Sequence, residues 1–259
     1  MVTATLDELQ ERRSEALRLR PELALESLKE AEAFVRERGV VTLTPSCSLP
    51  SLYGACHEEP YTPGGKGFGA YPRTKWRWGW ELRERPGVYW LRLLRGTGVF
   101  LTGAAAGVAG PLCREEVRRA EEGAHGEEPA RLVRHLATAG PSLLDEIKEE
   151  LALSATALRN ARMPLERFGA VVAREVVLER DGRHRHTTEL RRWDQLQPGP
   201  GPAAGGVGAL LVAGVRAAVL APEREARNWF SWPAGPELVE EIVADERLVR
   251  PEAGWLAAP

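Results

Sequence analysis

Apolar residues in the central part of the chain recur first at helical spacing and then at strand spacing. They return every three or four residues in three successive stretches. The helical positions are Leu132, Val133 and Leu136, then Leu144, Ile147 and Leu151, then Leu158, Ala161, Leu165 and Phe168. Because residues at i, i+3, i+4 and i+7 share one face of an α-helix, this segment is expected to form three amphipathic helices.

The ends of the second and third helices carry capping signals. Ser142 is expected to cap the second helix, with Asp145 three residues later as a loose capping box. Ser154 is expected to cap the third helix. Pro164 lies inside the third helix and predicts a kink or a restart there, because proline has no N–H to donate.

A β-hairpin is expected after the third helix. Residues 171–178 are rich in valine, residues 186–190 return as their partner, and Asp181-Gly182 is a tight-turn dipeptide between them. Three helices with a short second turn, followed by a hairpin, follow the order of a winged helix-turn-helix. We place this domain at residues 128–197.

The part of the chain before this domain, residues 1–127, is expected to form a helical and β-hairpin region. Its expected elements are helices within 3–38, a strand at 40–44, a mostly irregular stretch at 45–70, a β-rich stretch at 76–102 and a helix at 111–122. Within it, three cations at Arg73, Lys75 and Arg77 are interleaved with tryptophans. Period two is typical of a half-buried strand, so we expect the indoles to fill the core and the cations to face outward. The alternative is that the indoles stack on unpaired bases.

The part after the domain begins with a linker at residues 198–206, which consists of Pro, Gly and Ala. Residues 207–259 then repeat the order of helices and a short terminal hairpin, which predicts a second, degenerate winged helix. The expected fold class is therefore α+β, with tandem winged helix-turn-helix domains behind a small β-containing N-terminal region.

Positive charge is concentrated in parts of the chain rather than spread over all of it. The chain of 259 residues has a formal net charge of −2, so no overall basic field indicates nucleic acid. Residues 154–192 nevertheless hold nine Arg against five acids, and residues 71–95 hold seven basic residues against two acids. Residues 222–252 hold four Arg against eight acids, so we expect 207–259 to be structural or dimerising.

The order of the elements and a set of short segments resemble the AlkZ-like (YcaQ-related) proteins, which include bacterial DNA glycosylases acting on alkylated or crosslinked DNA. The segments that carry the likeness are Pro86-Gly87-Val88-Tyr89-Trp90, Leu94-Arg95-Gly96, Gly140-Pro141, Leu190-Arg191-Arg192-Trp193 and Trp229-Phe230-Ser231-Trp232. They span roughly residues 75–259. The resemblance implies DNA binding, a role in DNA repair and a bacterial source.

DNA contacts are expected from three places. A recognition helix would present side chains opposite its apolar stripe to the major groove, a wing would contact phosphates or the minor groove, and the basic 71–95 segment would add further cations. The expected DNA-binding residues are Ser154, Thr156, Arg159, Asn160 and Arg162 on the helix, Arg183, His184 and Arg185 at the wing, and Arg73, Lys75 and Arg77 before the first hairpin. The alternative is a solvated charged face on a protein-interaction module.

No catalytic residue can be assigned from the sequence. The family's glycosylases use a Gln-hydrophobic-Gln or Gln-hydrophobic-Asp signature in the N-terminal half, and this chain has neither there. The remaining candidates are Gln195 and Gln197, which lie beside the linker, and Glu58 and Glu59, which lie in a Gly/Pro-rich loop. Neither place is expected to hold a catalytic side chain rigidly in position. We therefore expect DNA binding without rapid base excision, with an active glycosylase as one alternative and a protein-interaction or regulatory module as another.

The glycine-rich loop and the cysteine and histidine residues do not predict a phosphate or metal site. The glycine-rich loop at 63–69 lacks the spacing of a P-loop. Cys47, Cys56 and His57 do not form a metal-binding motif, and His184 with His186 is a weak pair. We expect no metal and no cofactor. Three cysteines, no signal-peptide core and no apolar run of transmembrane length predict a cytoplasmic protein without a membrane partner. The local basic charge and the resemblance make double-stranded DNA its expected partner.

Overall fold

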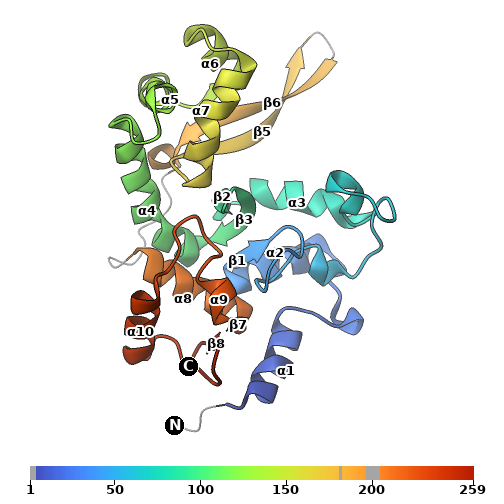
Figure 1. Cartoon of the computed structure of the whole chain (residues 1–259). Coiled ribbons are helices and arrows are strands. Elements are labelled where there is room, and N and C mark those ends of the chain that lie inside the picture. Colours follow the sequence, from blue (N-terminus) through green and yellow to red (C-terminus); the bar gives the residue numbers. More distant parts are fainter. Residues whose placement is uncertain (1–3, 181–182, 197–204) are drawn as a thin grey trace.

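Helices and small antiparallel sheets share the chain, as the alternation of helical and strand periodicity predicts (Figure 1). The computed structural model describes residues 4–180, 183–196 and 205–259, and of Arg180 and Arg183 the backbone alone. The α+β class is therefore confirmed. The predicted Asp181-Gly182 turn, Gln197 and most of the predicted linker lie outside the described residues.

The central unit contains the three predicted helices and the predicted hairpin. Its elements are α5 (Glu127–Ala139), β4 (Ser142–Leu143), α6 (Leu144–Glu150), α7 (Ala155–Arg167), β5 (Val171–Arg180) and β6 (Arg183–Arg192). The sheet order is β4-β6-β5, all antiparallel, with Ser142 opposite Leu190 and Val171 opposite Arg192. The apolar stripe of α7 is buried at Leu158, Ala161 and Leu165.

Of the two predicted helix caps, the cap of the second helix is wrong and the cap of the third helix is confirmed. Ser142 does not cap α6, because it is paired with Leu190 in β4. The residue before the helix is Leu143, whose N–H donates to Glu146 Oε2 at 2.9 Å. Ser154 caps α7 as predicted, since its Oγ accepts from Ala157 N–H at 3.1 Å. Pro164 does not restart the helix, because α7 runs without interruption from Ala155 to Arg167.

The N-terminal unit is built around a second three-stranded sheet. It comprises α2 (Leu28–Arg38), β1 (Val40–Thr42), short helical segments, β2 (Val88–Leu94) and β3 (Thr97–Thr102). The sheet order is β1-β3-β2, again antiparallel. Before it stands α1 (Leu6–Ala16), whose Thr5 forms a capping box with Glu8.

The expected strand at the tryptophans is wrong. Residues 75–84 form a run of helical turns: a 3-10 turn at Lys75–Arg77, α3 (Trp78–Glu81) and a 3-10 turn at Leu82–Glu84. Packing decides this, because a Cβ on Gly79 would lie 2.5 Å from Tyr53 Oη and 2.7 Å from Leu43 Cδ1. Tyr53 Oη also donates to the carbonyl of Trp76 at 2.6 Å. Tertiary contacts thus override the period-two pattern.

The long helix α4 (Gly103–Glu121) connects the two units and starts earlier than the helix expected at residues 111–122. The C-terminal unit follows the central one and consists of α8 (Val207–Ala218), β7 (Leu220–Pro222), α9 (Glu223–Ala226), α10 (Pro236–Ala244) and β8 (Trp255–Ala257). β7 pairs with β8, and Val249 forms a bridge to Ala257 on the other side of β8.

One order of elements therefore occurs three times. In each unit a helix leads into a short strand, helical segments follow, and the short strand pairs with the last strand of the unit. The pairs are β1 with β3, β4 with β6, and β7 with β8. The units thus share a connectivity although their sequences and helix lengths differ.

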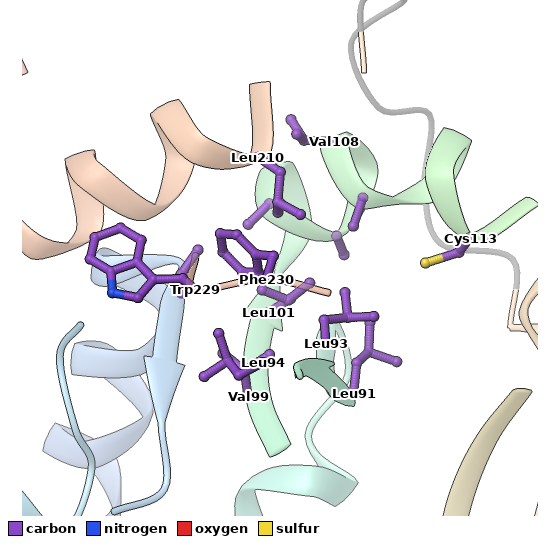
Figure 2. Packing of buried hydrophobic residues seen from close by; sticks show 14 of the residues in the cluster. Leu91, Leu93, Leu94, Val99, Leu101, Val108, Cys113, Leu210, Trp229 and Phe230 are labelled. Atoms are coloured by element: carbon purple, nitrogen blue, oxygen red, sulfur yellow. The ribbon is translucent and has the colours of Figure 1, made fainter. Parts of the chain in front are cut away.

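One hydrophobic core joins the three units. Figure 2 shows Leu91, Leu93 and Leu94 of the β2–β3 hairpin against Val108 of α4, Leu210 of α8 and the Trp229-Phe230 pair. Ser231 adds backbone anchoring, because its N–H and its hydroxyl both donate to the carbonyl of Leu93, at 2.8 and 3.1 Å. Residues 207–259 are therefore a structural part of this core. Among the described residues no helix has the length and apolarity needed to cross a membrane.

Candidate functional site

The first half of α7 presents its polar face to solvent. Ser154, Thr156, Arg159 and Asn160 are all exposed, opposite the buried stripe of the same helix. The side chain of Arg159 is exposed and has no hydrogen bond or ion pair with any residue that the structure describes. This face therefore offers one unpaired guanidinium, one amide and hydroxyl groups on a rigid, capped helix.

Arg162 lies one turn after Arg159 on α7 but is less exposed. Its side chain is 24% exposed and its Nε lies 3.2 Å from Glu166 Oε1. Glu166 is buried and also meets Arg92 of β2, with Arg92 Nε 2.9 Å from Oε2. Arg162 is thus engaged in an ion-pair cluster between α7 and β2 rather than presented outward.

The predicted wing residues lie on the β5–β6 hairpin. His184 is exposed and stands 3.5 Å from Glu179, its neighbour across the hairpin. Arg185 is exposed and forms an ion pair with Asp145 of α6. The side chain of Arg183 lies outside the described residues. Arg185 is therefore the wing arginine whose side chain is described, and it reaches back to the helix before α7.

The predicted cations before the first hairpin differ in exposure. Arg73 and Arg77 are exposed, and the Arg77 guanidinium lies 5.3 Å from the centroid of the Trp76 ring. Lys75 is turned inward: its Nζ donates to the carbonyl of Leu25 at 2.7 Å and to Glu26 at 3.1 Å. Lys75 therefore ties the helical segment to the N-terminal part of the chain.

A cleft of about 750 Å³ separates the helical segment 75–84 and β2 from the β5–β6 hairpin. A smaller cavity of about 240 Å³ shares part of its lining with this cleft and reaches Glu166. The residues common to both are Arg83, Trp90, Leu91, Val172, Ala173, Glu175 and His186. One continuous concavity thus joins the two segments in which positive charge is concentrated, 71–95 and 154–192.

Two contacts hold the walls of the cleft together. Trp80 Nε1 donates to Glu175 Oε2 at 3.0 Å, and Arg174 of β5 forms an ion pair with Glu84. Glu175 also lies 3.3 Å from His186 Nδ1 on the neighbouring strand. The hairpin is thereby fastened to the N-terminal unit across the cleft, which fixes the spacing of its walls.

The charges that line the cleft and the smaller cavity are nearly balanced. The lining contains Arg83, Arg92, Arg162, Arg174 and Arg191, together with Glu81, Glu84, Glu166 and Glu175. Aromatic side chains supply much of the remaining surface, namely Trp76, Trp80, Tyr89 and Trp90. The cleft is therefore an aromatic and arginine-lined site rather than a uniformly basic channel.

Glu166 is the carboxyl group of this lining whose pKa is shifted among the described residues. Burial raises the pKa of its carboxyl above the ordinary glutamate range, and the charges of Arg162 and Arg92 oppose that shift. Its Oε1 is buried without a hydrogen bond from any described residue. A buried carboxylate with two arginines at the end of a cavity is suited to receive a proton or to orient a polar ligand.

The catalytic candidates named from the sequence have structural roles where they are described. Gln195 accepts from Arg192 N–H at 2.9 Å and donates to the carbonyl of Leu136 at 2.7 Å. Glu58 accepts from the N–H groups of Thr74 and Lys75, at 2.6 and 3.2 Å. Glu59 is exposed, and Gln197 lies outside the described residues. The described candidates therefore stand apart from the cleft.

The cysteines and the glycine-rich loop have local partners. Burial raises the pKa of Cys56 to about 12, and its Sγ donates to the carbonyl of Leu52 at 3.2 Å. His57 Nε2 lies 2.6 Å from the carbonyl oxygen of Arg18. In the loop at 63–69, Phe68 packs on Tyr61, Tyr71, Trp76 and Trp80. In the part of the chain that the structure describes, no group of three His, Cys, Asp or Glu is placed to hold a metal ion.

Sequence reasoning missed Arg83, Trp90, Glu166 and Glu175. No local pattern marks them as one site, and they come together only because the turn at 82–84, β2, α7 and β5 meet around the cleft and the smaller cavity. One signal was available: Glu166 is a charged residue one position after Leu165, at the edge of the stripe predicted to be buried. Comparisons with models of protein families, with curated proteins and with solved structures found no match.

Proposed function

We propose that this chain is a DNA-binding protein of tandem winged helices and that residues 127–196 form the winged helix that contacts duplex DNA. In this proposal α7 is the recognition helix and the β5–β6 hairpin is the wing. The resemblance to AlkZ-like proteins makes DNA repair the setting that we propose for it.

The order of elements in the central unit carries the proposal. A helix, a short strand, two helices separated by a tight turn and a hairpin follow one another, and the short strand pairs with the second strand of the hairpin. Winged helices that bind DNA place the second helix of the helix-turn-helix in the major groove. α7 has that position, and its free face carries Ser154, Thr156, Arg159 and Asn160.

The chemistry of these side chains fits the two kinds of contact that such a helix makes. An asparagine can bond an adenine edge with both its amide atoms, and an arginine can bond guanine or phosphate. Arg159 is ready for either contact because no described residue neutralises it. Arg162 contributes indirectly in this proposal, by positioning Glu166 and the base of α7.

Salt-dependent binding is the test of this proposal. Because the net charge is −2, affinity has to come from a few local cations. Each lost phosphate contact reduces the slope of log affinity against log salt by roughly 0.9. Fluorescence anisotropy with an end-labelled duplex, over a salt series, should show a shallower slope for Arg159→Ala. Arg224→Ala, an exposed arginine of α9, is the matched control.

An outcome without any salt-dependent affinity for DNA would overturn the proposal. It would favour the alternative of a protein-interaction module, for which the same charged face is solvated or covered by a protein. Equal slopes for Arg159→Ala and wild type would remove α7 from the interface.

The buried carboxylate of Glu166 favours a second candidate function, that of a DNA glycosylase. In base excision a water adds to C1′ as the C1′–N bond breaks, the base leaves with the bonding electrons, and a carboxylate takes the proton of the water. Glu166 is a carboxyl in a concave site, with a raised pKa and two arginines beside it.

Strand cleavage at abasic sites tests this second candidate. The full chain is incubated with duplexes that carry N7-alkylguanine, N3-alkyladenine or an interstrand crosslink, and alkali then cuts at abasic sites. Cuts that depend on the protein and vanish in Glu166→Gln, but persist in Glu81→Gln, would support it. Binding without any cuts would leave DNA binding as the function.

A further inference from the structure

Arg83 is the exception among the arginines that line the cleft and the smaller cavity beside it. Arg92 and Arg162 meet Glu166, Arg174 meets Glu84, and Arg191 meets Glu189 at 2.5 Å. Arg83 forms no ion pair and no hydrogen bond with any residue in the described part of the chain, and its Nε is buried without a partner. Burial lowers the pKa of the Arg83 guanidinium, and the charge of Glu175 opposes that shift without a direct ion pair, so an anion from outside the chain would stabilise the charge of Arg83.

Two indole rings hold the guanidinium of Arg83. Its Cζ lies 4.2 Å from the centroid of the Trp90 ring and 5.3 Å from that of Trp80. The Trp90 ring is itself fixed, because its centroid lies 4.6 Å from that of the Phe100 ring. It also packs directly on the backbone of Gly98, where a Cβ would lie 1.9 Å from Trp90 Cζ2. Stacking occupies the faces of a guanidinium and leaves its edge N–H groups to donate to an anion.

The remaining walls of the cleft suit a flat group. Trp76, Trp80, Tyr89 and Trp90 line one side, and Val172 and Ala173 line the other. The volume of about 750 Å³ is within the range of roughly 300–1,000 Å³ that small-molecule sites occupy. Aromatic side chains provide stacking surfaces for nucleobases, whatever the base.

We infer that the cleft between the helical segment 75–84 and the β5–β6 hairpin binds a nucleotide, with its phosphate at Arg83 and its base against the tryptophan wall. The nucleotide is either free or an unpaired nucleotide of a DNA strand. The second source rests on the proposed function, because the hairpin that borders the cleft is the proposed wing (Figure 1).

Two binding measurements on the full chain separate the sources. The first measures, by fluorescence anisotropy, the affinity for a fully paired duplex and for the same duplex with one bulged nucleotide. The second titrates free deoxyadenosine monophosphate by calorimetry. Each is repeated with Arg83→Gln, with Arg83→Lys and with the control Arg85→Gln, whose arginine is exposed and paired with Glu32 at 3.3 Å outside the cleft. Thermal unfolding verifies that every variant is folded.

If the nucleotide belongs to a strand, wild type should bind the bulged duplex roughly tenfold more tightly than the paired one. This preference should vanish in Arg83→Gln and persist in the control Arg85→Gln. It should be smaller in Arg83→Lys, because lysine keeps the positive charge but has no planar group to stack on the indoles. If the site takes free nucleotides, the calorimetric binding should follow the same order of variants without a preference between the duplexes.

Equal affinity of wild type for both duplexes, together with no binding of the free nucleotide, would overturn the inference. Salt-dependent duplex affinity in that case would leave the proposed function intact. Binding of the free nucleotide through Arg83 by a chain that binds no duplex would support the site and contradict the proposed function. A bulge preference that survives in folded Arg83→Gln would also overturn the assignment of the phosphate to Arg83.

Discussion

α7 and the helical segment 75–84 occupy the same place in two units of the same connectivity, directly before a hairpin. α7 is a single capped helix of 13 residues with a buried stripe and an exposed polar face. Segment 75–84 consists of three short turns, and its residues Trp76, Trp80 and Arg83 line the cleft. One position in the fold therefore serves two purposes: a helix that displays side chains outward, and a wall that displays them across a cavity.

α7 and segment 75–84 are stabilised by different kinds of contact. α7 is specified locally, by Ser154 as its cap and by residues at helical spacing. Segment 75–84 is specified by its surroundings, because Gly79 fits closely against Tyr53 and Leu43. Substitutions in the two segments should therefore differ in their effect on the free energy of unfolding.

The largest effect is expected at the buried stripe of α7. Leu165 is fully buried in the core that joins the units, so Leu165→Ala should lower the free energy of unfolding by about 2–5 kcal/mol. Urea denaturation of the full chain, followed by circular dichroism, measures it. A loss comparable to that of an exposed α7 residue would show that the stripe does not anchor the helix.

A smaller effect, of opposite sign in the two segments, is expected from substitution by alanine at Gly79 and Asn160. Gly79→Ala should destabilise by about 1–3 kcal/mol, because the added Cβ meets Tyr53 and Leu43 at less than contact distance. Asn160→Ala at the exposed face of α7 should be neutral or stabilising by up to about 0.7 kcal/mol. Stabilisation by Gly79→Ala would mean that helix propensity, rather than close packing, governs segment 75–84.

The sequence predicts the elements that local residues specify better than those that distant residues specify. The helices and the hairpin of the central unit were predicted because their apolar spacing is regular and their signals are local. The tryptophan segment was assigned to a strand because alternation was the only local evidence, and its neighbours Tyr53 and Leu43 are distant in sequence. The cleft was not predicted as a site, since it exists only where β2 meets β5.

The smallest effect concerns pH. Burial raises the pKa of Glu166 in the folded chain above its unfolded value of about 4.3. Between the two values the folded state binds more protons, so this group contributes stability that is present below the unfolded pKa and is lost as pH rises through the folded pKa. Glu166→Gln should therefore remove part of the decline in the free energy of unfolding with rising pH just above the ordinary carboxyl range. An identical pH dependence in the variant would contradict the raised pKa.

The central claim is that α7 of the central unit lies against duplex DNA. Photo-crosslinking from a benzoylphenylalanine that replaces Asn160 tests it most directly, with the same group in place of Arg224 on α9 as the control. The account predicts a covalent adduct with labelled duplex from position 160 that unlabelled duplex competes away and that added salt reduces, and no adduct from position 224. A chain that binds the duplex but forms no adduct from position 160, or forms equal adducts from both positions, would contradict the account.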